Sequence, residues 1–83
     1  MMAALYVADL DEFRPVVEGC RKAGHRVQGP RAGYWSVESD GPITLERKAM
    51  GLGPALWYTC LAGGIRGQVL EYGRERLVIG DAP

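Results

Sequence analysis

The chain has 83 residues, enough for one domain with a thin hydrophobic core, and residues 1–83 are expected to form that single domain. Ten basic residues balance ten acidic ones and neither sign forms a block, so the composition disfavours nucleic-acid binding. No apolar run approaches the ~20 residues of a membrane helix, and the N-terminus lacks the pattern of a signal peptide. A soluble cytoplasmic protein is expected, and its 47% apolar share favours a homodimer or a partner subunit that covers the excess.

Residues 3–8 are short, apolar and rich in strand-forming side chains, so they predict a first strand. Apolar residues then recur at the spacing of one helical face, which predicts a helix near residues 10–24. Pro15 would cost about 3 kcal/mol well inside a helix. Residues 10–13 are therefore expected to form a loose first turn, with the regular helix beginning near Arg14.

Four further strands are predicted, near residues 34–38, 43–48, 67–72 and 75–80. The first two are expected to form a hairpin in which Val37 faces Leu45, because that register gathers their apolar side chains on one face. The last two are expected to form a hairpin around Gly73 and Arg74, with Leu70 opposite Leu77. A short strand over residues 25–28 is also considered.

The most apolar stretch carries no charge and predicts a helix near residues 54–62. Pro54 suits the first helical position, and Gly63 and Gly64 suit the end. A strand remains the alternative, because a short apolar run cannot be decided by its period alone. The segment is expected to be hidden from solvent, with the other elements packed on it, or to meet a second subunit.

This order of elements predicts an α+β fold: a two-layer sandwich of one mainly antiparallel sheet with two helices on one face. Ferredoxin-like folds and ligand-sensing domains of the ACT kind share the order. The opening Ala-Leu-Tyr-Val-Ala-Asp-Leu-Asp, residues 4–11, resembles the first strand and helix of a half-module of the glyoxalase and extradiol-dioxygenase superfamily. That resemblance implies metal ligands, often His or Glu, on strands, and only Glu46 on a later strand matches.

Candidate chemistry is sparse. One histidine and two separated cysteines do not match a zinc pattern, so neither a metal nor a cofactor is expected. Cys20 shares a helical stripe with valines, so core packing is favoured over a nucleophilic pair with His25. The glycines before residue 54 suggest an anion-binding turn, but a structural loop is favoured because the fuller dinucleotide pattern is absent.

The aromatic residues are the most suggestive feature: Tyr34, Trp35, Trp57 and Tyr58, with Arg47 expected beside Trp35 across the hairpin. One interpretation is a core with a dimer interface, where such residues are typical anchors. The other is a pocket for an aromatic or cationic small molecule. The hypothesis is a non-enzymatic domain that works through protein association, with a ligand-binding module as the alternative and an enzyme of the glyoxalase type least favoured.

Overall fold

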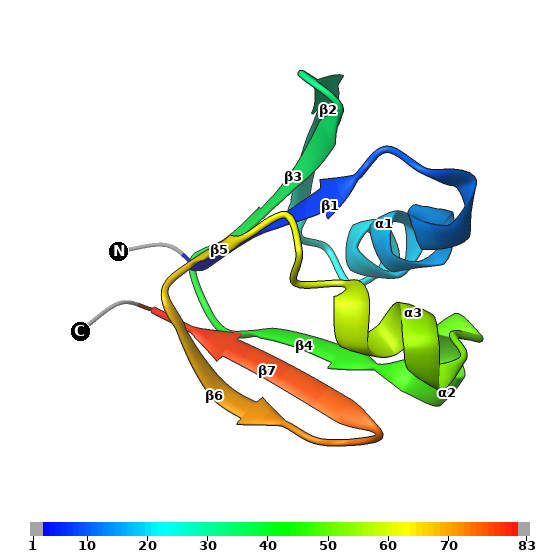
Figure 1. Ribbon diagram of the computed structural model, residues 1–83. Helices are drawn as coiled ribbons and strands as arrows, with labels where there is room; N and C mark the ends of the chain where they lie inside the picture. The colour runs from blue at the N-terminus through cyan, green and yellow to red at the C-terminus, as the bar shows by residue number, and fades with distance from the viewer. Residues whose placement is uncertain (1–2, 82–83) are drawn as a thin grey trace.

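The computed structural model describes residues 3–81 and contains two antiparallel sheets that diverge from one end, with helices at the open end between them (Figure 1). The helical elements are the 3-10 helix η1 (Asp11–Phe13), α1 (Arg14–Lys22), α2 (Arg47–Met50) and α3 (Pro54–Thr59). The strands are β1 (Ala3–Ala8), β2 (Arg26–Arg31), β3 (Tyr34–Ser39), β4 (Ile43–Glu46), β5 (Ile65–Arg66), β6 (Gln68–Tyr72) and β7 (Arg76–Gly80).

The first sheet has the strand order β2-β3-β1-β5, and β1 is its central apolar strand. Leu5 lies opposite Val37 of β3 and Ile65 of β5, while Val7 lies opposite Trp35. Because side chains alternate along a strand, these residues share the inner face. Leu5, Val7 and Val37 are almost completely buried there.

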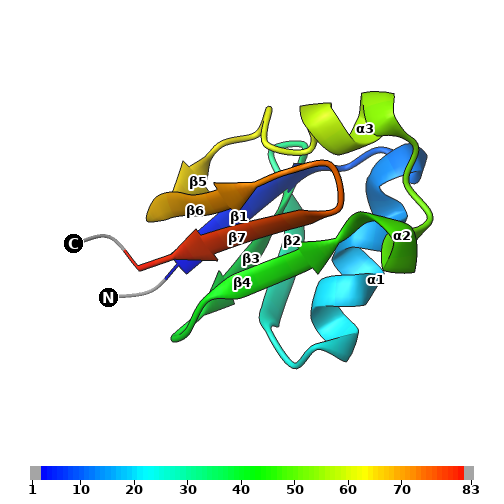
Figure 2. The same cartoon turned by 90° about the horizontal axis from the view of Figure 1, so that it is seen from below.

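The second sheet has the order β4-β7-β6. Ile43 lies opposite Ile79 and Leu45 opposite Leu77, so four buried side chains form its inner face. Seen from below, its strands lie side by side in front of the first sheet, with the helices at one end (Figure 2). Gly67 carries the chain directly from β5 to β6 with a φ of 117°, a conformation that costs glycine little.

Helix α1 begins at Arg14 with Pro15 in its first turn and η1 before it, as the sequence predicts. Its buried side chains Val16, Val17 and Cys20 enter the space between the sheets. Together with Trp57 of α3, they join the inner faces of both sheets in one core. The predicted α+β class is confirmed.

The predicted hairpin between residues 34–38 and 43–48 is wrong. Val37 pairs with Leu5 and Val27 in the first sheet, whereas Leu45 pairs with Leu77 in the second. The sandwich therefore has two sheets in place of the single one expected. Alternation identifies which side chains face inward, but it does not identify the neighbouring strand.

The final hairpin is confirmed with a shifted register. Leu77 lies opposite Tyr72, two positions from the predicted partner Leu70, and the ladder is irregular between Val69 and Glu71. A shift of two residues leaves the side chains of a strand on the same face.

The apolar segment is helical, as expected, but shorter, and its predicted burial is wrong. Of residues 54–62, only Trp57 and Cys60 are buried, and Tyr58 is 53% exposed. Helix α3 covers one end of the core, so only one of its faces contacts protein (Figure 1). The elements therefore pack around β1, α1 and the β4–β7 pair rather than around residues 54–62.

Candidate functional site

The five aromatic and basic residues singled out from the sequence lie in two separate places. Tyr34 and Trp35 belong to β3 of the first sheet. Arg47, Trp57 and Tyr58 lie around α2 and α3, next to the β6–β7 turn. The expected cross-strand pair of Trp35 and Arg47 is wrong, because it depended on the hairpin that does not form.

Trp35 anchors β3 to the first helix. Its indole Nε1 donates a hydrogen bond to the Asp9 carboxylate at 3.0 Å. The guanidinium carbons of Arg14 and Arg21 lie 5.8 and 5.9 Å from the ring centroid, within cation–π range. The polar contacts and ring partners of Trp35 therefore belong to α1 and the loop before it.

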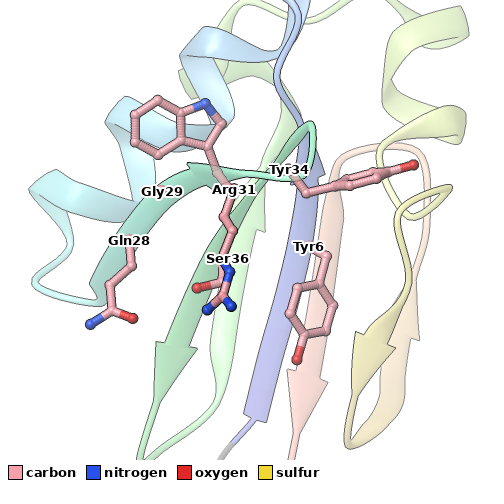
Figure 3. A pocket seen from close by; sticks show the side chains of 7 residues that line it. Tyr6, Gln28, Gly29, Arg31, Tyr34 and Ser36 are labelled. Atoms are coloured by element: carbon pink, nitrogen blue, oxygen red, sulfur yellow. The ribbon is translucent and has the colours of Figure 1, made fainter.

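The outer face of the first sheet carries a shallow pocket of about 350 Å³, here called the outer pocket (Figure 3). It is lined by Tyr6, Gln28, Gly29, Arg31, Tyr34, Trp35 and Ser36. Figure 3 shows Arg31 extending over the strands toward Ser36 and Tyr6, while the Tyr34 ring turns aside. Tyr6 was missed from the sequence, although the alternation of β1 places it on the face opposite Leu5 and Val7.

Trp57 is a core residue that fixes α3 to the second sheet. Its side chain is fully buried, and Nε1 donates to the carbonyl oxygen of Gly73 at 2.8 Å. The Tyr72 hydroxyl donates to the Trp57 carbonyl at 2.8 Å, and the two rings meet edge to face with centroids 6.0 Å apart. These contacts make Trp57 a packing residue rather than part of an open pocket.

A second pocket, here called the turn pocket, lies between α3 and the β6–β7 turn. It has a volume of about 380 Å³ and is lined by Arg47, Pro54, Tyr58, Arg74 and Glu75. The exposed Tyr58 ring packs against Tyr72 at a centroid distance of 5.8 Å. The turn pocket thus brings together two of the residues predicted from the sequence, Arg47 and Tyr58. The other three, Pro54, Arg74 and Glu75, lie at the helix start and the turn that the sequence predicts, but they were not among the predicted site residues.

Arg47 connects three parts of the turn pocket. It donates from Nε to the Arg74 carbonyl at 2.9 Å and from Nη1 to the Leu52 carbonyl at 3.0 Å. Its Nη2 donates to Glu75 Oε1 at 2.9 Å, and Lys48 Nζ lies 3.9 Å from Oε2. The hydrogen bond from Arg47 holds the pKa of the Glu75 carboxyl below its usual value. The positive charges of Lys48 and Arg74 also lower this pKa, so three cations lie around the Glu75 carboxylate. The excess of positive charge disfavours the cationic ligand considered from the sequence.

The two thiols are buried in the core, as expected for Cys20. Burial, and secondarily the neighbouring Cys60, raises the pKa of Cys20 to about 12. Burial also raises the pKa of Cys60, and it raises that of Tyr72 to about 12. Because a thiol with a raised pKa stays protonated at neutral pH, Cys20 is a poor nucleophile.

Glu46 is engaged in an ion pair with Arg76, whose Nε lies 3.1 Å from its Oε1. It was the one strand residue that the glyoxalase resemblance offered as a metal ligand. Within residues 3–81, no three histidine, cysteine or acidic side chains gather as they would around a metal ion. Among the helices in this range, none is long and apolar enough to cross a membrane.

Comparisons with known proteins show the fold. No protein-family model matches the sequence, and no curated protein matches it. Among solved structures, the chain is similar to a chain in the structure of a phenol hydroxylase–regulatory protein complex. The TM-score is 0.77 at 12% sequence identity, and the superposition covers 96% of this chain and 98% of that one. The two chains therefore share one architecture over nearly their whole lengths.

Proposed function

We propose that this chain is a non-catalytic subunit that binds a larger protein and acts through that association. The observation that carries the proposal is the full-length fold match to a chain found in a complex of an enzyme with its regulatory protein. The match covers 96% of this chain and 98% of that chain, so it involves the whole fold and not a single motif.

The exposed apolar side chains support this proposal. The large ones are Leu10, Tyr34, Tyr58, Val69 and Leu70. Several gather where α3 meets β6, because Tyr58 packs on Tyr72, which shares one face of β6 with Val69 opposite Leu77 and Ile79. Leu70 lies on the other face of this edge strand, where its side chain covers Gly80. We call Tyr58, Val69, Leu70 and Tyr72 the α3–β6 surface, which therefore extends over both faces of β6. Exposed tyrosine and apolar side chains gathered around a sheet edge mark a candidate protein-binding surface.

Association is tested first on the purified chain by light scattering coupled to size exclusion, which separates a monomer from a homodimer. The tagged chain is then used to capture proteins from an extract of its own cells. Leu70→Glu places a charge in the α3–β6 surface and is expected to weaken capture at least ~10-fold. Leu10→Glu is the matched control, because Leu10 is similarly exposed and precedes η1 on another part of the molecule.

The proposal predicts that wild type and Leu10→Glu retain the same larger protein in a fixed ratio and that Leu70→Glu loses it. A homodimer disrupted by Leu70→Glu, with no larger protein retained, would leave self-association as the function. A monomer that retains nothing, or equal capture by both variants, would refute the proposal.

The outer pocket supports a second candidate, a small-molecule binding module. Its volume falls within the usual range for ligand sites, and it combines the Tyr6 and Tyr34 side chains with the guanidinium of Arg31. A titration with aromatic carboxylates and aromatic amines, followed by NMR of the labelled chain, tests this candidate. Saturable shifts at Tyr6 and Tyr34 that disappear in Arg31→Gln would support it, and no shift with any compound would refute it.

A further inference from the structure

We propose that the turn pocket receives a carboxylate side chain from an acidic segment of the protein partner. Tyr58 and Pro54 would cover apolar atoms of the same segment, while Arg74 would pair with its carboxylate. This inference rests on the proposed function and deepens it, because it assigns a chemistry to the partner.

The charge of the turn pocket carries the first step. Arg47 and Arg74 line the pocket with a single acid, Glu75, and Lys48 lies 3.9 Å from that acid outside the lining. These four side chains carry an excess of two positive charges, although the whole chain is neutral. A local excess of one sign selects partner groups of the opposite sign and accelerates their approach. The expected occupant is therefore anionic.

The geometry identifies Arg74 as the donor that faces the partner. Arg47 is engaged in the two carbonyl bonds and the Glu75 contact, and its side chain is only 20% exposed. The Arg74 carbonyl accepts one of these bonds, which holds the turn in place. In the range 3–81, no side chain forms an ion pair with the Arg74 guanidinium. An Arg fork of this kind matches a carboxylate, and a charge-assisted pair is about twice as strong as a neutral hydrogen bond.

The apolar walls favour a carboxylate on a polypeptide over a free anion. The half-exposed Tyr58 ring belongs to both the turn pocket and the α3–β6 surface, so the pocket is continuous with the proposed interface. A segment with an acidic residue between apolar ones would place its charge on Arg74 and its apolar atoms on Tyr58 and Pro54. Inorganic phosphate would use the charge alone.

The test uses the full chain labelled with ¹⁵N and three capped peptides that differ at one central position flanked by leucines. The central residue is glutamate, glutamine or lysine, and inorganic phosphate is a fourth probe. The glutamate peptide is expected to shift the amide signals of Tyr58 and Arg74 saturably, with a dissociation constant near ~1 mM, typical of one short contact. Glutamine and lysine peptides are expected to bind at least ~10-fold more weakly.

Two variants locate the contact. Arg74→Gln removes the exposed guanidinium and is expected to weaken the glutamate peptide at least ~5-fold. Lys22→Gln removes an exposed positive charge at the end of α1, which lines neither the outer pocket nor the turn pocket, and is expected to change nothing. Raising the salt concentration from about 20 to about 200 mM should also weaken binding, because exposed charges are screened.

Equal binding of the glutamate and glutamine peptides, full binding by Arg74→Gln, or tighter binding of phosphate would each overturn the inference. These failures are distinguishable from failure of the proposed function. If the larger protein is still captured through the α3–β6 surface, association stands and only the carboxylate assignment falls.

Discussion

Replacing Trp57 by phenylalanine tests whether one buried indole holds α3 against the β6–β7 turn. The substitution removes the Nε1 donor to Gly73 and leaves its carbonyl without this partner; a lost hydrogen bond of this kind costs about 1 kcal/mol. It also removes about 40 Å³ of ring from a site with no exposed surface, which adds about 1 kcal/mol at ~24 cal/mol per Å³ of cavity.

The free energy of unfolding should therefore fall by about 2 kcal/mol, and Tm by roughly 10 °C for a domain of this size. Urea denaturation followed by circular dichroism measures the change. Trp35→Phe is the matched control, since the Trp35 indole donates to an exposed carboxylate and phenylalanine keeps a ring beside the two arginines. Its expected cost is under ~1 kcal/mol. If Trp57→Phe costs no more than Trp35→Phe, the anchoring role of Trp57 is refuted.

Three further outcomes are expected. A Cβ at Gly63 would collide with the backbone carbonyl of Tyr6, so Gly63→Ala should cost about 1–3 kcal/mol in the same denaturation assay. Gly41→Ala is the control and should cost little, because no atom lies within 4 Å of an added Cβ there. Similar losses in the two variants would contradict the close packing of Gly63 on the Tyr6 backbone. Because the pKa of Cys20 is raised from 9.0 to about 12, the unfolded chain loses this proton first. The stability contribution of Cys20 is thus complete below about pH 9 and declines toward pH 12. In Cys20→Ala the urea midpoint should therefore fall less steeply between these pH values. An unchanged slope would show that the Cys20 thiol does not cause the loss of stability. Tyr58→Ala should change stability by less than ~1 kcal/mol because the ring is half exposed, yet reduce partner capture; unchanged capture would exclude Tyr58 from the interface.

In the strands and in α1 the sequence predicts which side chains are buried, but it does not predict the burial of residues 54–62 or which strands are neighbours. The alternation in β3 and β4 correctly marks Val37, Ile43 and Leu45 as inward-facing. It predicted the wrong pairing because both strands satisfy that pattern equally well with partners elsewhere in the chain. Strand pairing depends on contacts between distant segments, and a local period carries no information about those contacts.

The candidate site shows the same limit. Tyr58 and Arg47 were selected for their types, and the structure brings them together at the turn pocket. Arg74 is predicted as a turn residue, but neither it nor Glu75 is selected for a site, because no periodicity in a turn distinguishes a functional charge from a solvated one. Trp57 was selected for the same reasons as Tyr58, yet it is wholly buried. Two neighbouring residues of this short helix thus differ completely in burial, and the residue types alone do not show which of the two faces the core.

The strands at the sheet edges have a consequence for how this protein meets others. The ladder of β2 is irregular between Gln28 and Arg31, that of β6 is irregular between Val69 and Glu71, and β5 has two residues. Short or interrupted edges are poor templates for an added strand. Fibril-like stacking and main-chain pairing between copies are therefore discouraged along these three edges, where recognition of another molecule depends on the shapes and charges of side chains.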